Sequence, residues 1–362
     1  MVDLEQKSVE IMLANQAGSG AIIACPDFPT YRYCWLRDGS FAAWALLRSG
    51  RAEACEAFLR WVGRTVETQA PRLQRPGERY ALPTRYAVDG SVVNDEWPNH
   101  QIDGYGTWLW CLAEHRRATG SARLFTEHAL AIEQTVEYLA RTWQEPCFDC
   151  WEENGTRIHS STLACVYGGL AALTAFPAEP VAARAAALAA QVRGFLLQST
   201  VDGRFRKHDG TASVDASLLW LSHPFAVVPP DHPLMAGTVR EIERRLLRRG
   251  GVCRYAEDTY YGGGRWLILS AWLGWHYART GRTAEARELL AWVESQADAE
   301  GAMPEQVSVD VNDPAMIAPW VGRWGPIAKP LVWSHAMYVV LLKELATAES
   351  ASATLHTEES SR

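Results

Sequence analysis

Residues 263–298 read GGRWLILSAWLGWHYARTGRTAEARELLAWVESQAD, and this stretch contains two helical patterns joined by one tight turn. The first half is apolar almost all round, which is typical of a helix covered on both sides. The second half continues in Ala, Leu, Arg and Glu with a helical period. Between them, Arg279-Thr280-Gly281 places a cation in the last turn of a helix and a glycine stop after it. The stretch therefore predicts a helical hairpin.

The same joint recurs at Arg48-Ser49-Gly50 and at Arg117-Ala118-Thr119-Gly120, which indicates a weak repeat of about two helices per unit. Alternating β-branched runs, the signature of strands, are scarce. Extended along the chain, the helical period predicts twelve helices, at 3–16, 38–49, 51–70, 100–119, 122–143, 158–175, 178–198, 212–221, 231–249, 263–280, 282–298 and 332–347.

Short joints alternate with six long segments, at 17–37, 71–99, 144–157, 199–211, 250–262 and 299–331. Six hairpins closed into a ring would place all six segments on one rim, each leading into the amino end of an inner helix. Segments entered in this way, such as 107–111 and 266–270, are apolar almost all round, as inner helices should be. We therefore predict an all-α fold, an (α/α)6 barrel of twelve helices with its functional site on that rim. The alternative is an open α-solenoid, whose long loops would more often be spread along a face.

Composition limits the partners that this chain can have. A chain of 362 residues with 48% hydrophobic content can bury one large core or two modest ones. The formal net charge of -7 and the absence of a basic block argue against nucleic acid and anionic membranes and permit a neutral substrate. No stretch approaches the ~20 apolar residues that span a bilayer, and the start of the chain has no signal pattern, so we expect the cytoplasm.

Eight cysteines are too few for a disulfide-stapled scaffold of this length. Cys147 and Cys150 have the CxxC spacing of redox or zinc sites. A zinc site would need two further ligands at matched spacing, and the sequence has no second CxxC or paired histidine motif. We interpret the spacing as chance, and we predict no metal and no cofactor.

Two glutamates stand in aromatic-rich loops. Glu152 lies in FDCWEENG (148–155), and Glu305 lies in MPEQ (303–306) ahead of a tryptophan-rich segment. Taken singly, Glu152 could belong to a polar turn and Glu305 to an exposed loop. Flanking Phe148 and Trp151 would half-bury the carboxyl group of Glu152 and raise its pKa. One protonated and one ionised carboxyl group are what the hydrolysis of a glycosidic bond requires.

Three further clusters combine aromatic side chains with paired hydrogen-bonding groups. They are YRYCWLRDGS (31–40), RYAEDTYYG (254–262) and NDEWPNHQIDG (94–104). Each can be read as ordinary helix capping, by Asp38, by Asp258 or Thr259, and by Asn99 respectively. Capping leaves the tyrosines and tryptophans without a role, whereas an adjacent Arg and Asp supply the donor and acceptor that a sugar hydroxyl needs. In the third cluster, capping and substrate contact by Trp97 and Gln101 are equally supported.

Four motifs, in order, resemble glycoside hydrolase family 15, the glucoamylase-like enzymes. They are Trp35-x-Arg37-Asp38, Asp149-x-Trp151-Glu152-Glu153, Arg254-Tyr255-x-Glu257-Asp258-Thr259-Tyr260, and Glu305-Gln306 followed by Leu331-Val332-Trp333-Ser334. They span Tyr31 to Tyr338, which is most of the chain. Members of this family share the (α/α)6 barrel.

The resemblance implies a role for each matching residue. Glu152 corresponds to the general acid and Glu305 to the general base that activates water. Arg37, Asp38 and Arg254 correspond to the groups that bind the hydroxyls of the terminal glucose. The remaining expected substrate contacts are Tyr31, Trp35, Trp97, Trp151, Glu153, Glu257, Tyr260 and Trp333. The family inverts the anomeric centre and releases β-glucose, which implies carboxyl groups ~6.5–9.5 Å apart.

The chain departs from the family in having no room for an amino-terminal β-sandwich or a starch-binding module, and Cys150 stands where a larger apolar residue is frequent. We expect a single catalytic domain over 1–348, a disordered tail over 349–362, and short substrates such as isomaltose or maltose. A trehalase of the same family is an alternative, as are a phosphorylase and a non-catalytic sugar-binding protein on the same barrel. Linkage preference, substrate length, oligomeric state and any redox role of Cys147 and Cys150 are open at this point.

Overall fold

The computed structural model describes residues 2–69, 71 and 81–359, with side chains as far as residue 351. Its α-helices are α1 (Leu4–Ala14), α2 (Leu36–Arg48), α3 (Ala52–Gln69), α4 (Asp103–Thr119), α5 (Arg123–Glu127), α6 (Ala129–Thr142), α7 (Ser160–Leu173), α8 (Ala182–Gln198), α9 (Pro233–Arg245), α10 (Leu267–Arg279), α11 (Thr283–Glu294), α12 (Ile317–Trp324) and α13 (Val332–Glu359). The 3-10 helices are η1 (Pro29–Tyr31), η3 (Ala216–Leu221), η4 (Tyr260–Gly262) and η5 (Pro314–Met316).

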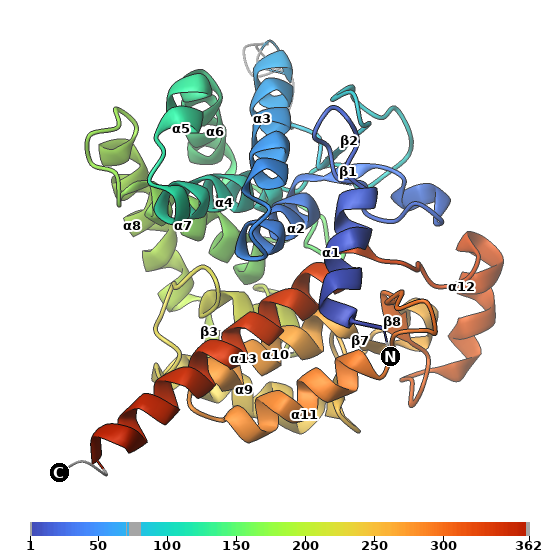
Figure 1. Ribbon diagram of the computed structural model, residues 1–362. Coiled ribbons are helices and arrows are strands. Elements are labelled where there is room, and N and C mark those ends of the chain that lie inside the picture. The colour runs from blue at the N-terminus through green and yellow to red at the C-terminus, as the bar shows by residue number, and fades with distance from the viewer. Residues whose placement is uncertain (1, 70, 72–80, 360–362) are drawn as a thin grey trace.

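Six elements form a closed inner ring. α2 contacts α4, α4 contacts α7, α7 contacts η3, η3 contacts α10, α10 contacts α13, and α13 contacts α2 again. The outer helices α1, α3, α6, α8, α9 and α11 pack against this ring, each beside the inner element that it precedes or follows (Figure 1). The closure confirms the (α/α)6 barrel and contradicts an open solenoid.

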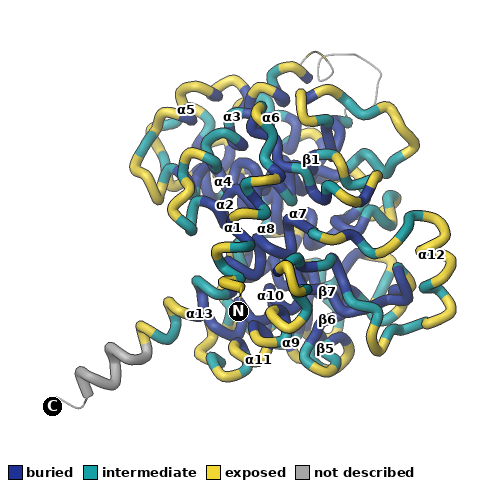
Figure 2. The backbone as a smooth tube through the Cα atoms, turned by 45° about the vertical axis from the view of Figure 1, so that its right-hand side comes forward, coloured by how far each residue is buried: buried dark blue, intermediate teal, exposed yellow. Residues whose placement is uncertain are grey.

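Burial follows the two layers of the barrel. In α10 every residue except the last, Arg279, is buried, and α7 is nearly as enclosed. The outer helix α11 buries only Ala286, Leu289, Leu290 and Val293, which share one helical face. Figure 2 shows the buried backbone running through the centre and the exposed backbone on the outside. The all-round apolar patterns therefore identified inner elements correctly.

Two glycines let α4 and α7 approach to backbone contact. A Cβ atom at Gly106 would lie 2.3 Å from the carbonyl oxygen of Cys165, and one at Gly169 would lie 2.2 Å from the carbonyl oxygen of Gly106. Real Cβ atoms do not come so close, so any side chain at either position would force the two helices apart. Both helices begin at the rim, and this contact fixes the spacing between them.

Helix ends differ from the predicted bounds by up to four residues, and four differences are larger. Segment 212–221 forms only the 3-10 helix η3, because Asp215 is extended and its carboxylate accepts the N–H of Ser217 as an N-cap. Segment 122–143 breaks at His128 into α5 and α6. Segment 299–331, predicted as loop, contains α12. The final helix runs to Glu359 instead of 347, into the segment predicted as a tail, whose residues 360–362 lie outside the described range.

Eight two-residue strands join the long loops. They are β1 (Cys34–Trp35) with β2 (Arg85–Tyr86), β3 (Thr200–Val201) with β4 (Arg204–Phe205), and the antiparallel sheet of β5 (Leu247–Arg248), β6 (Gly251–Val252), β7 (Arg265–Trp266) and β8 (Gln306–Val307). All six long segments lead into the amino ends of inner elements, as predicted, with 72–80 outside the described residues. In the part of the chain that the structure describes, no helix is long and apolar enough to cross a membrane.

Candidate active site

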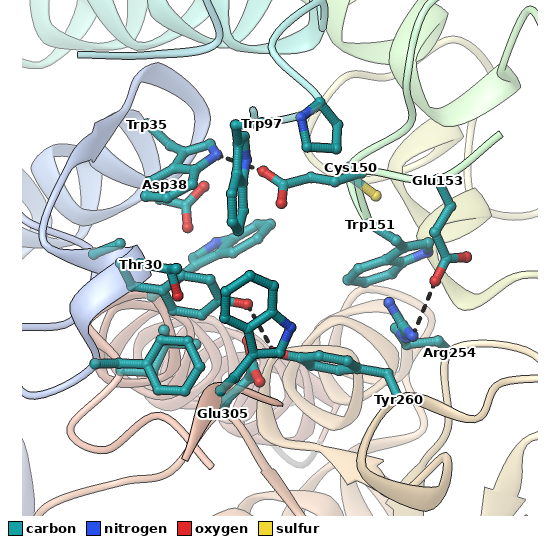
Figure 3. Close-up of a pocket in the computed structure, with 18 of the residues that line it drawn as sticks. Thr30, Trp35, Asp38, Trp97, Cys150, Trp151, Glu153, Arg254, Tyr260 and Glu305 are labelled. Carbon is teal, nitrogen blue, oxygen red and sulfur yellow. Dashed lines mark hydrogen bonds and ion pairs between the residues drawn. The ribbon is translucent and has the colours of Figure 1, made fainter. Parts of the chain in front are cut away.

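A cavity of about 320 Å³ opens at this rim (Figure 3). Five of the six long loops, together with the first residues of the inner helices, supply its walls. The lining residues include Phe28, Thr30, Tyr31, Trp35, Arg37, Asp38, Glu96, Trp97, Cys150, Trp151, Glu152, Glu153, Arg254, Tyr260, Trp266, Glu305, Trp320, Arg323, Trp324 and Trp333. The sixth loop, 199–211, contributes none of the lining residues.

Glu152 sits at the tip of a tight turn whose backbone is strained. Its φ is +65°, in the left-handed region that side chains other than glycine rarely adopt. The turn is held by Asp149, whose Oδ1 accepts the N–H groups of Trp151 (3.0 Å) and Glu153 (2.9 Å). Strain of this kind persists only where the surroundings enforce it, and it concentrates at functional sites.

The carboxyl group of Glu152 is pinned from the opposite side of the cavity. Trp35 Nε1 donates to its Oε1 at 2.7 Å, and Gln101 Nε2 donates to the same oxygen at 3.3 Å. Burial raises the pKa of Glu152, and these donors oppose that rise because they stabilise the ionised form. The direction of this shift is the one that the sequence predicts.

Glu305 is fixed by its backbone between two inner helices. Its N–H donates to the carbonyl oxygen of Ala328 (2.9 Å), and β8, which follows it directly, pairs with β7 at the start of α10. The side chain is 3% exposed, and Oε2 makes no hydrogen bond with the described residues. Burial raises the pKa of Glu305 to about 8, and the negative charge of Glu152 acts in the same direction.

Arg37 and Asp38 occupy the first turn of α2 and point into the cavity from the barrel core. Arg37 Nη1 donates to Gln101 Oε1 and Asp103 Oδ2, both at 2.8 Å, and its Nε lies 3.2 Å from Asp38 Oδ2. Burial raises the pKa of Asp38 to about 6, although Arg37 acts to lower it. Together Arg37 and Asp38 offer a fixed donor and a fixed acceptor, which is the pair that a sugar hydroxyl needs.

Arg254 forms the opposite wall with a similar arrangement. Its Nε donates to Asp258 Oδ2 at 2.8 Å and its Nη2 to Oδ1 at 2.5 Å, so the guanidinium is held by both carboxylate oxygens. Nη2 also lies 3.2 Å from Glu153 Oε1, and Tyr255 donates to Glu153 Oε2 at 2.5 Å. In Figure 3, Arg254 and Glu153 face the cavity beside Trp151.

The mouth of the cavity is aromatic. Trp97 packs edge-on against Trp35 (6.0 Å between ring centroids) and at a tilt against Trp324 of α12 (6.2 Å). The guanidinium of Arg85, which is fully buried, lies 4.0 Å from the ring centroid of Trp97 and anchors that ring from behind. Flat, rigid aromatic faces above paired hydrogen-bonding groups suit a pyranose ring.

Nearly the whole chain matches one known family. Residues 4–343 match the family model described as Glycosyl hydrolases family 15. The chain belongs to glycoside hydrolase family 15. It is therefore a glycoside hydrolase, and its barrel is the one that this family uses.

Individual relatives in the family agree. The chain is 39% identical over 359 residues to the isomaltose glucohydrolase of Kribbella flavida, covering 95% of this chain and 92% of that protein. A solved wild-type glycosidase superposes with a TM-score of 0.91 at 38% identity, covering 95% of this chain and 96% of that one. The Mycobacterium tuberculosis trehalase is 26% identical over 79% of this chain, which spans 47% of that protein. Hormoconis resinae glucoamylase shares the fold, with a TM-score of 0.77 at 16% identity. The superposition covers 95% of this chain and 73% of the glucoamylase chain.

Twelve of the thirteen residues that the sequence predicts for the site of this family 15 enzyme line the cavity. They are Tyr31, Trp35, Arg37, Asp38, Trp97, Trp151, Glu152, Glu153, Arg254, Tyr260, Glu305 and Trp333. The exception is Glu257, which is exposed, lies outside the cavity and accepts a hydrogen bond from Ser213. The neighbouring Asp258 is the buried carboxylate, because the turn directs it inward onto Arg254 and also onto the N–H of Tyr260.

Sequence reasoning missed two sets of residues at the family 15 site. Arg85 and Asp103 support lining side chains from behind; no local pattern marks Arg85, and Asp103 lies in the third cluster without a predicted contact. Trp320, Arg323 and Trp324 reach the cavity from α12, and tryptophan density at 320–333 was the available signal. Cys150, which the sequence marks as a departure from the family, lines the wall, and burial raises the pKa of its thiol.

Cys147 and Cys150 are not joined by a disulfide. All eight cysteines are buried free thiols. Among the described residues, no group of three or more His, Cys, Asp and Glu side chains is placed to hold a metal ion.

The paired carboxyl groups predict a bell-shaped dependence of kcat/KM on pH. With Glu152 and Glu305 in the roles expected from the sequence, the active form carries one proton between them, and both pKa values are raised, that of Glu305 to about 8. Activity should fall at low pH, where both groups are protonated, and again above pH about 8, where both are ionised. We expect the acid limb to lie above the ordinary glutamate pKa of ~4.5. Initial rates between pH 4 and 10 measure both limbs, and a rate that still rises at pH 10 would contradict the shared proton.

Proposed function

We propose that this enzyme is an inverting, exo-acting α-glucosidase that removes one glucose from the non-reducing end of short α-glucosides, with isomaltose as its preferred type of substrate. The observation that carries the proposal is the convergence of Glu152 and Glu305 with Arg37, Asp38 and Arg254 on one cavity. The 39% identity to an isomaltose glucohydrolase over nearly the whole chain supports the choice of linkage. The trehalases are less similar and much longer than this chain.

In the proposed reaction, Glu152 gives its proton to the glycosidic oxygen as the bond to the anomeric carbon breaks. Glu305 removes a proton from a water molecule that attacks that carbon from the opposite face. Water adds its hydroxyl group to glucose, the leaving sugar departs neutral, and one proton has moved from Glu152 to Glu305. The Oε2 of Glu305, which has no partner among the described residues, is available to accept that hydrogen bond.

The raised pKa of Glu305 bears on its assignment as the base. A base must be ionised, and burial favours the protonated form of Glu305. Hydrogen bonds from water and from substrate hydroxyls would favour the ionised form, as the Tyr31 hydroxyl already does. We therefore propose that substrate binding lowers the pKa of Glu305, so that in the complex Glu305 is ionised and Glu152 carries the proton.

The shape of the mouth supports a short substrate. α12 buries none of its residues, yet Trp320, Arg323 and Trp324 line the cavity beside Glu96 and Trp97. These side chains enclose the space next to the proposed glucose site, where the leaving sugar would lie. We propose a single catalytic domain in 1–348, and the eight free thiols support the cytoplasm as its compartment.

A panel of disaccharides tests the linkage and the stereochemistry together. With isomaltose, maltose, trehalose, kojibiose and nigerose, we expect kcat/KM for isomaltose to exceed that for trehalose by at least ~10², because a site built to bind substrate hydroxyls rejects misplaced ones. Proton NMR of the first turnovers should show β-glucose before mutarotation.

Four outcomes would contradict the proposal in different ways. Trehalose as the best substrate would favour the trehalase alternative. Dependence on added phosphate, with glucose 1-phosphate as product, would indicate a phosphorylase. Initial α-glucose would exclude inversion. Binding of all five sugars without turnover would leave a sugar-binding protein.

A further inference from the structure

One long loop, 199–211, supplies nothing to the cavity wall but places a buried cation directly behind it. Lys207 is 6% exposed. Its Nζ lies 2.8 Å from Asp215 Oδ2 and 3.4 Å from Asp149 Oδ2. It also lies 4.0 Å from the ring centroid of Tyr255. A lysine is rarely buried without such partners, so its position is built around these two carboxylates.

The two carboxylates hold the turn that carries Glu152 from both sides. Asp149 Oδ1 accepts the N–H groups of the residues before and after Glu152. Asp215 accepts Trp151 Nε1 at 3.2 Å to Oδ1 and 3.0 Å to Oδ2. The strained φ of Glu152 is therefore enforced by two anions that make no contact with the cavity space themselves.

Charge explains why these anions need Lys207. Asp149 is 1% exposed and Asp215 is fully buried, and two buried carboxylates close to one cation repel each other once that cation is removed. Burial acts to raise the pKa of Asp215, but Lys207 and Ser217 outweigh it and lower the pKa. The other charged or titratable neighbours are His159, whose Nδ1 lies 3.9 Å from Asp149 Oδ2, and Glu153, which acts on Lys207 at longer range.

We propose that Lys207 is a positioning residue for acid catalysis: by bridging Asp149 and Asp215 it holds the turn of Glu152 so that the acid proton points at the glycosidic oxygen. The proposal rests on the role of Glu152 as the acid. It assigns a function in the reaction to a side chain that is absent from the cavity wall, in a loop that supplies no lining residue.

Substrates that differ in their leaving group test this role. Lys207→Met removes the charge and keeps most of the volume. We expect kcat on isomaltose to fall by about 10²-fold, as for a catalytic group displaced by about 1 Å. With α-glucosyl fluoride, whose fluoride leaves with little need of a proton, we expect kcat within about threefold of wild type. Undiminished fluoride hydrolysis also shows that the variant is folded. Lys343→Met, which removes a partly exposed lysine of α13 that pairs with Glu5 of α1 and does not line the cavity, is the matched control and should change neither rate.

Two further variants test whether Lys207 acts through Asp215 and Glu152. Asp215→Asn retains an acceptor for Trp151 but loses the ion pair, and it should show the same selective loss if Lys207→Met does not fold. In Lys207→Met/Glu152→Gln we expect no loss beyond that of Glu152→Gln, since both changes disable one proton transfer. Equal losses on both substrates, or losses that multiply, would overturn the role of Lys207. If Glu152→Gln itself showed no dependence on the leaving group, the assignment of the acid would fail first.

Discussion

Glu152→Gln is expected to lower kcat on isomaltose by about 10²–10⁴-fold, the usual contribution of a positioned acid, while α-glucosyl fluoride is hydrolysed at close to the wild-type rate. The amide keeps the hydrogen-bonding size of the carboxyl group, so Trp35 and Gln101 still have a partner at this position. Only the transferable proton is lost. Initial rates on both substrates, with a circular dichroism spectrum as the check on folding, measure the effect.

The matched control for this variant is Glu257→Gln. Glu257 lies on the same rim but outside the cavity, and its carboxylate binds only Ser213 among the interactions seen. We expect both rates of Glu257→Gln to stay within about twofold of wild type, as for surface substitutions in general. A collapse of fluoride hydrolysis in Glu152→Gln, as large as that on isomaltose, would remove Glu152 from the acid role.

Glu305→Gln is expected to abolish turnover of both substrates, again by about 10²–10⁴-fold, because the attacking water needs a base whatever group departs. This pattern separates the two glutamates, which pKa alone does not, since burial raises both. If fluoride survived in Glu305→Gln and failed in Glu152→Gln, the two roles would be exchanged.

The melting temperature of Glu305→Gln at two pH values shows whether this variant is correctly folded. The folded-state pKa of Glu305, about 8, exceeds the ordinary value of 4.5, so the native state binds this proton more tightly than the unfolded state. Wild-type stability from this group therefore falls as pH rises from 4.5 to 8, and the amide removes that loss. Glu305→Gln should melt above wild type at pH 8.5, by a few degrees, and equal to it at pH 4. A lower melting temperature at pH 8.5 would mean that the inactive protein is damaged.

The barrel could be predicted because its signals are local. The stop at Arg279-Thr280-Gly281 and the all-round apolar pattern after Trp266 each need only neighbouring residues to be read. The shortness of the 3-10 helix η3 could not be predicted. Asp215 caps it at its start, although the sequence would allow a helix to begin earlier. Helix α12 could not be predicted either, because eight residues in a tryptophan-rich loop do not give a clear helical period.

The candidate site divides in the same way. Side chains that carry their own aromatic or acidic neighbours, such as Glu152 and Arg254, were identified from motifs. Asp103 and Lys207 were not, because each acts on a residue far away in the chain and only the closed ring brings them together. The sequence does not distinguish Glu257 from Asp258 as the inward carboxylate. Side-chain direction in an irregular turn depends on φ and ψ at each residue, which two adjacent carboxylates do not reveal.

The left-handed backbone of Glu152 implies a trade-off between thermal stability and activity. Of the common residues, glycine fits a φ of +65° without penalty, and its introduction at this position would relieve on the order of 1 kcal/mol. If Glu152 is the acid, directed evolution for melting temperature alone would therefore favour Glu152→Gly, a protein that survives heating but has lost its activity. A screen for a more robust variant has to count released glucose in every round.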